Sequence, residues 1–162
     1  MLFALSTSFA PLSNAAYTHE DLTLTVLINS NDVSSHNTKD NPLVLNVDND
    51  INVNFAIQNN GETVHLTDMS IDIFTVQTIL FWDWEAKIYT HQIDVDNADD
   101  DGDGMEGFDI PAGLSESDSF IVDDEEIAEY KDQVRGQRVR IDVNFNFESI
   151  SDYTITVYID FV

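Results

Sequence analysis

The sequence predicts an all-β fold, an antiparallel sandwich of seven or eight strands. From Asp21 onward, apolar and polar residues alternate with a period of two over most of the chain, which is typical of strands that bury one face. Polar stretches rich in Asn, Asp and Gly separate these segments, and Asn59-Asn60-Gly61 is a strong turn signal. One polar and one apolar face on most strands is what two stacked sheets require.

The expected strands follow one another along the chain. Leu43 begins a long one that Asp48-Asn49-Asp50 breaks or bulges and that continues to Ile57. The clearest hairpin joins the alternating segments 139–147 and 153–161. The remaining expected strands are 22–28, 64–73, 76–93 and 120–122.

The run 76–93 is the longest of these segments, and it contains both tryptophans. Trp82 and Trp84 share one face of the expected strand with Ala86 and Ile88. Two tryptophans on one face can form a platform on which sugar rings stack. Because apolar residues continue the same stripe, the pattern favours a place for both tryptophans in the core.

One short helix is expected, over about 124–135. Asp123 or Asp124 can cap its N-terminus, and Asp123 and Glu126 have the spacing of a capping box. Gly136 follows the last turn, where helices commonly end on a glycine. A helix of about three turns is a connector packed on a sheet edge and not a core element.

The composition is that of one globular domain with an acidic surface. The chain has 162 residues, of which 43% are hydrophobic, enough for a full-sized core. Its 31 acidic and 6 basic residues give a net charge of −25. Such a charge repels nucleic acid and anionic lipid headgroups and favours cations or basic partners. Nucleic-acid binding is therefore excluded. The chain has no Cys, so disulfides and Cys-zinc sites are excluded too.

The most distinctive stretch is an acidic loop, residues 94–109, which contains no Lys or Arg. Carboxylates at this density repel one another unless a hard cation neutralises them, and Ca²⁺ takes six to eight oxygen ligands. Gly102 and Gly104 allow a sharp turn around an ion. Two alternatives remain open, adaptation to high salt and a simple solvated face. The expected calcium ligands are Asn97, Asp99, Asp101, Asp103, Glu106 and Asp109.

We divide the chain into an apolar N-terminal segment, 1–16, and a β-sandwich domain, 17–162. The segment has no charged side chain and ends in small residues, so it is similar to the last part of a secretory signal. It is too short and too interrupted to span a membrane. Alternatively it is an extended arm that adds as a strand to a neighbouring subunit's sheet. The apolar residues expected to make that contact are Leu2, Phe3, Leu5 and Phe9.

Three runs, Ile51–Leu66, Phe108–Ser115 and Arg138–Phe145, resemble an immunoglobulin-like sandwich. The closest likeness is to the late-embryogenesis-abundant and cell-adhesion-related domains of archaeal surface proteins. It covers residues 20–162 and implies a binding or structural module without catalytic residues. The acidic loop resembles the D-x-D-x-D-G calcium loops of EF-hands, dockerins and thrombospondin-type repeats. It departs from the EF-hand because the twelfth position counted from Asp99 is Ile110, which has no carboxylate.

Together these features predict a secreted, calcium-stabilised structural subunit of a prokaryotic cell-surface filament, sheath or layer. Such a subunit forms a homo-oligomer or homopolymer through the donated N-terminal strand. The alternative is a monomeric calcium-dependent adhesin or carbohydrate-binding module with a glycan ligand. No nucleophile motif, zinc-protease motif or phosphate-binding glycine loop occurs in the sequence, so we do not expect an enzyme.

Overall fold

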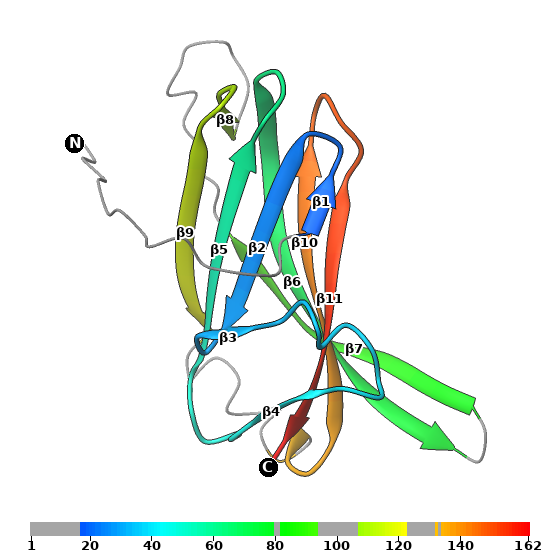
Figure 1. The fold of residues 1–162 in the computed structure, drawn as a ribbon. Helices are drawn as coiled ribbons and strands as arrows, with labels where there is room; N and C mark the ends of the chain where they lie inside the picture. The colour runs from blue at the N-terminus through cyan, green and yellow to red at the C-terminus, as the bar shows by residue number, and fades with distance from the viewer. Residues whose placement is uncertain (1–16, 80–81, 94–106, 123–131, 133) are drawn as a thin grey trace.

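The chain folds into two β-sheets around one apolar core, as the computed structural model shows (Figure 1). The structure describes residues 17–79, 82–93, 107–122, 132 and 134–162. The all-β class predicted from the sequence is therefore confirmed. The N-terminal segment 1–16 lies outside the described residues.

The first sheet, sheet A, has the strand order β1-β2-β5-β9, with β3 paired to β2. All of its pairs are antiparallel. Leu22–Ile28 shows the expected alternation, with Leu22, Leu24, Val26 and Ile28 buried and the residues between them half-buried. The strands of sheet A are β1 (Tyr17–His19), β2 (Leu22–Ile28), β3 (Asn31–Asp32), β5 (Ile51–Asn59) and β9 (Ser115–Val122).

The second sheet, sheet B, has the order β4-β11-β10-β6-β7, with β8 paired to β6. The expected C-terminal hairpin is confirmed, since β10 pairs with β11 antiparallel from Arg138 opposite Asp160 to Phe145 opposite Tyr153. The strands of sheet B are β4 (Leu43–Leu45), β6 (Val64–Ile79), β7 (Trp82–Ile93), β8 (Phe108–Ile110), β10 (Arg138–Phe147) and β11 (Tyr153–Phe161).

The core lies between the sheets and takes side chains from both. Phe55 of β5 meets Phe145 of β10 edge to face, with ring centroids 6.2 Å apart. Leu24 and Ile57 of sheet A and Val143 and Ile159 of sheet B are fully buried in the same cluster. Burial of these alternate residues is the main term that stabilises the fold.

Asn59 ties together three segments at one end of the molecule. Its buried side-chain amide donates to the carbonyl oxygens of Glu62 and Ile110, and its Oδ1 accepts from the Gly61 N–H at 2.9 Å. Its main chain bonds to Leu114 and Gly113. The predicted turn after β5 is thus confirmed, and its first residue also anchors the β8–β9 connection.

The structure corrects three details of the predicted strands. Residues 43–57 are not one interrupted strand, because β4 belongs to sheet B and β5 to sheet A. The pairing of β4 with β11 is parallel, so sheet B is mixed and not purely antiparallel. The described residues contain eleven strands where seven or eight were expected, because β1, β3, β4 and β8 are short pairings of two or three residues.

The run 76–93 is also not a single strand. Its first residues end β6 and the rest form β7, which folds back so that Ile79 pairs with Trp82. The expected helix at 124–135 lies outside the described residues except at Asp132, Val134 and Arg135. Gly136, expected as the C-terminal glycine, has a φ of 69°, a left-handed conformation that glycine adopts without strain.

Candidate functional site

The acidic loop joins β7 to β8, and only its last predicted ligand is among the described residues. Asn97, Asp99, Asp101, Asp103 and Glu106 lie outside them. Asp109 lies in β8, where it pairs with His65 of β6. Its side chain is 40% exposed, so its carboxylate remains accessible at the end of the loop.

His65 holds the Asp109 carboxylate. The imidazole is 6% exposed, and its Nδ1 lies 3.0 Å from Oδ1 of Asp109. Gly107, just before β8, has a φ of 121°. A Cβ added there would lie 2.3 Å from the Leu66 carbonyl oxygen and 3.0 Å from Nε2 of His65. The chain therefore leaves the acidic loop against β6 at a position where only glycine fits.

Within the part of the chain that the structure describes, no group of three or more His, Asp and Glu side chains is arranged to hold a metal ion. Residues 94–106, which include five of the six predicted ligands, lie outside this part. The predicted calcium site thus stays a prediction. What the structure adds is the anchored carboxylate of Asp109.

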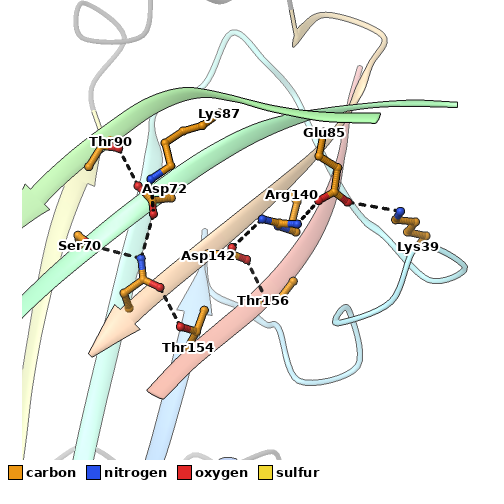
Figure 2. A network of polar contacts seen from close by, with 11 residues as sticks. Lys39, Ser70, Asp72, Glu85, Lys87, Thr90, Arg140, Asp142, Thr154 and Thr156 are labelled. Atoms are coloured by element: carbon orange, nitrogen blue, oxygen red, sulfur yellow. Dashed lines mark hydrogen bonds and ion pairs between the residues drawn. The ribbon is translucent and has the colours of Figure 1, made fainter. Parts of the chain in front are cut away.

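A second polar feature covers the outer face of sheet B, and Figure 2 shows it in detail. Arg140 of β10 is its centre. The guanidinium stacks 4.0 Å from the ring centroid of Phe74 and contacts the carboxylates of Glu85 and Asp142. Glu85 also lies 3.4 Å from the Lys39 ammonium. These contacts connect β6, β7 and β10 with the loop before β4, and acidic and basic side chains alternate along them.

A smaller cluster surrounds Asp72 on the same face (Figure 2). The carboxylate accepts hydrogen bonds from the Thr90 hydroxyl at 2.7 Å and from the Asn144 amide at 3.2 Å, and it pairs with Lys87 at 2.8 Å. Burial raises the pKa of Asp72, but the hydrogen bonds from Lys87 and Thr90 outweigh burial, so the pKa lies below its ordinary value. The carboxylate is therefore kept charged.

Every described Lys and Arg is paired with a carboxylate in this way. Arg138 forms a two-point pair with Asp160 at 2.7 and 2.9 Å, and this hydrogen bonding raises the pKa of Arg138. Lys39 lies 2.7 Å from Asp83, and that hydrogen bond raises the pKa of Lys39. Arg135 pairs with Asp48 at 2.6 Å. The five described cations of this acidic chain are thus used in internal ion pairs.

The two tryptophans are not in the core, which corrects the prediction made for them. Trp82 is 79% exposed and Trp84 is 59% exposed. The register places them opposite Ile79 and Gln77, beyond the last pair of β10 with β6 at Val76. There the described part of sheet B is a ribbon of two strands, which Figure 1 shows projecting from the body of the molecule.

A bulge interrupts the predicted stripe at Ile88, but it does not turn the tryptophans away from the core-facing side of the sheet. The pairing of β6 with β7 shifts between Ile73 and Phe74, so that Tyr89 and Lys87 are the successive partners and Ile88 is the extra residue. Trp82, Trp84 and Ala86 then continue the face of Tyr89. The tryptophans therefore lie on the core-facing side of sheet B. They are exposed because they lie beyond Val76, where the pairing of β6 with β10 ends.

A pocket of about 430 Å³ lies at the foot of this ribbon. Val76 stands at the ribbon side and Val162 at the C-terminal side, and the Arg138–Asp160 pair lies between them. Val162 is 64% exposed, and the neighbouring β4 residue Val44 is 59% exposed. The complete lining consists of Lys39, Val76, Gly136, Gln137, Arg138, Asp160, Phe161 and Val162.

Sequence reasoning found the polar face of β10 but missed the partners of its arginines. The alternation of Arg138 and Arg140 with buried Val139 and Ile141 was a visible signal that both face solvent. Nothing local indicated that Glu85 or Lys39 would lie beside them. Glu85 contacts Arg140 across 55 residues of chain, and Arg138 donates to the Lys39 carbonyl oxygen across 99 residues, so only the tertiary fold brings them together.

No protein-family model matches the chain, and no curated protein sequence matches it. Among solved structures, the sporulation control protein Spo0M from Bacillus subtilis is similar, with a TM-score of 0.54 and 9% identity over 88% of this chain. This chain spans 50% of the Spo0M chain, and the likeness concerns the fold alone. A β-glucosidase from Listeria innocua matches with a TM-score of 0.41 and 14% identity, over 87% of this chain and 16% of the enzyme.

No described helix has both the length and the apolar character needed to cross a membrane.

Proposed function

We propose that this chain is a non-catalytic structural subunit of a secreted prokaryotic cell-surface filament, sheath or layer. Its fold would be an immunoglobulin-like sandwich that Ca²⁺ stabilises through the acidic loop. The N-terminal segment would leave the subunit as an extended arm and add a strand to a neighbouring sheet. The copies would then form a homopolymer.

The observation that carries this proposal is the edge of sheet A. Among the described strands, β9 pairs only with β5, from Ile51 opposite Val122 to Gln58 opposite Ser115. An edge strand offers main-chain N–H and C=O groups to a further strand, and natural proteins usually shorten or cover such edges. At eight residues, β9 is as long as the segment Leu2–Phe9. A strand from another copy would pair along its whole length.

Removal of residues 1–16 tests the strand donation. We expect the full chain to polymerise and the truncated chain to stop at a small soluble species, measured by light scattering and electron microscopy. A matched control keeps the length and replaces Leu2, Phe3, Leu5 and Phe9 by Ser, which should weaken assembly because the apolar contacts are lost. A truncated protein that still forms polymers would refute the donation.

Calorimetry tests the calcium proposal. We expect Ca²⁺ to bind the wild-type chain and to bind Asp101→Ala more weakly, because one oxygen ligand is lost. Glu148→Gln, an exposed carboxylate outside the loop, is the matched control and should bind like wild type. Equal heats for wild type and Asp101→Ala would identify a solvated acidic loop without a site.

The exposed tryptophans favour a second candidate function, a monomeric adhesin or carbohydrate-binding module. Trp82 and Trp84 lie two residues apart on one face of the ribbon, where aromatic rings can stack on sugar rings. A glycan array with and without a calcium chelator separates the two candidates. Glycan binding by a protein that remains monomeric at high concentration would favour the adhesin.

A further inference from the structure

The tryptophan ribbon carries two of the five large hydrophobic side chains that are exposed among the described residues. We define it as residues 77–79 of β6 and 82–84 of β7, which pair with each other and with no other described strand. A tryptophan buries about 150–250 Å² when it packs fully. With Trp82 79% and Trp84 59% exposed, most of this apolar area stays in contact with water. Exposed tryptophans of this kind are enriched at the centres of protein interfaces.

The same end of the molecule carries further apolar side chains, in and beside a pocket whose other five lining residues are polar, charged or glycine. The pocket at the foot of the ribbon has apolar walls at Val76, Phe161 and Val162, and Val44 lies beside it through the pairing of β4 with β11. Among the large hydrophobic residues found exposed in the described chain, Leu114 alone lies at the opposite end, next to Asn59. The exposed apolar side chains are therefore concentrated at the ribbon end.

The ribbon cannot fill its own pocket. Val76 faces the same side of sheet B as Arg138 and Asp160, its neighbours across the strands. Trp82 and Trp84 are on the other side, the one that continues the core-facing residues Ile71 and Ile73. Because the two faces of a strand point in opposite directions, the tryptophans point away from the pocket of their own chain. A second molecule is needed to bring the two surfaces together.

Charge favours this end for contact between two copies. The chain carries a net charge of −25, so two copies repel each other over most of their surfaces. Around the pocket, however, Lys39, Arg135 and Arg138 are each paired with carboxylates. This pairing lowers like-charge repulsion between the described residues of this end, and salt reduces what remains. A glycan would gain nothing from this neutralisation.

We propose that two copies of this chain form a two-fold symmetric dimer through their ribbon ends. Trp82 and Trp84 of each copy pack against the pocket and against Val44 and Val162 of the other. A two-fold axis lets one molecule be donor and acceptor at once, since contacts in such an interface occur in reciprocal pairs. This inference extends the proposed homopolymer by naming a second contact, which uses no residue of segment 1–16.

Intrinsic fluorescence of the full-length protein tests the dimer directly, because Trp82 and Trp84 are the chain's two tryptophans. We expect the emission maximum to shift to shorter wavelength as the protein concentration rises over about 1–100 μM, in step with dimer formation in analytical ultracentrifugation. High salt should strengthen the association. A spectrum that stays that of exposed tryptophan while the protein remains monomeric would refute the dimer.

Variants distinguish this contact from other assemblies. Trp82→Ser with Trp84→Ser should weaken dimerisation at least about 30-fold, and Val162→Asp should weaken it from the receiving side. Leu114→Ser, at the opposite end, is the matched control and should dimerise like wild type. Circular dichroism checks that the tryptophan variant folds. If it does not fold, the wild-type fluorescence and the Val162→Asp variant still test the dimer.

Two further experiments distinguish this dimer from strand donation by segment 1–16 and from glycan binding by the ribbon. The chain without residues 1–16 should still form dimers while polymers are lost, so the two contacts succeed or fail independently. Adding soluble oligosaccharides to dilute protein should leave the tryptophan emission unchanged. A blue shift caused by an oligosaccharide without dimerisation would assign the ribbon to a glycan and overturn the proposal.

Discussion

Asn59→Ala should be among the most destabilising single substitutions in this chain. The side chain is fully buried and makes three hydrogen bonds, to the N–H of Gly61 and to the carbonyl oxygens of Glu62 and Ile110. Alanine leaves those three main-chain groups without their partner. A buried polar group that loses its partner costs about 1–3 kcal/mol, and water that enters the space left by the amide reduces the cost. We therefore expect a loss of about 3–5 kcal/mol.

That loss is a large share of the stability of an ordinary domain, about 5–15 kcal/mol. At about 2–4 °C per kcal/mol for a chain of this size, the melting temperature should fall by roughly 10 °C. Urea denaturation followed by circular dichroism measures the free energy, and a thermal scan measures the midpoint. The same substitution releases the Ile110 carbonyl in β8, so it should also loosen the neighbouring candidate ligand Asp109.

The adjacent residue provides the control. The Asn60 side chain is exposed and donates to the Thr23 hydroxyl at 3.3 Å. Asn60→Ala should cost less than about 0.5 kcal/mol, as most surface substitutions do. If Asn59→Ala and Asn60→Ala have the same unfolding midpoint, the hydrogen bonds of Asn59 do not hold the three segments together and the reasoning is wrong.

Three other predictions follow from single contacts. Gly107→Ala should destabilise by several kcal/mol in urea denaturation, since its Cβ would lie 2.3 Å from the Leu66 carbonyl oxygen and its φ is 121°; an unchanged midpoint would contradict this. Arg140→Ala should cost about 2 kcal/mol, because Glu85 and Asp142 lose the guanidinium and Glu85 is left with Lys39, whereas equal stability of both proteins would show that the network is neutral. Burial, with help from nearby anionic groups, raises the pKa of Tyr17 to about 12. The folded state therefore favours the neutral phenol, and the stability that this gives is complete below pH 10 and is lost as the pH rises towards 12; Tyr17→Phe should flatten that part of the profile.

Alternation along the chain was enough to predict the strands β2, β10 and β11 and their buried faces. Residues 139–147 and 153–161 became β10 and β11, and the buried residues are the ones that the period of two selected. The period is a local property, because successive side chains of a strand point to opposite faces wherever the strand lies. The turn at Asn59 was equally local, since Asn and Gly favour that backbone.

The sequence pattern gave a wrong prediction where the structure depends on residues that are distant in the chain. The reversal between Ile79 and Trp82 contains Leu80 and Phe81 and no Gly, Pro, Asn or Asp, so nothing in the composition marked a turn. The bulge at Ile88 then changed which residues follow the face of Tyr89. Whether a side chain is covered depends on the other sheet, and no residue near Trp82 or Trp84 records where that sheet ends.

The sequence by itself determined that this protein is all-β and strongly acidic and that it carries a dense run of carboxylates at 94–109, because composition and short spacings are written in neighbouring residues. Only the tertiary structure decided that β4 runs parallel to β11, that His65 holds Asp109, and that the tryptophans lie exposed beside a pocket. Each of these depends on segments distant in the chain, which meet only after the sheets have formed. The features most useful for proposing a partner are of this second kind.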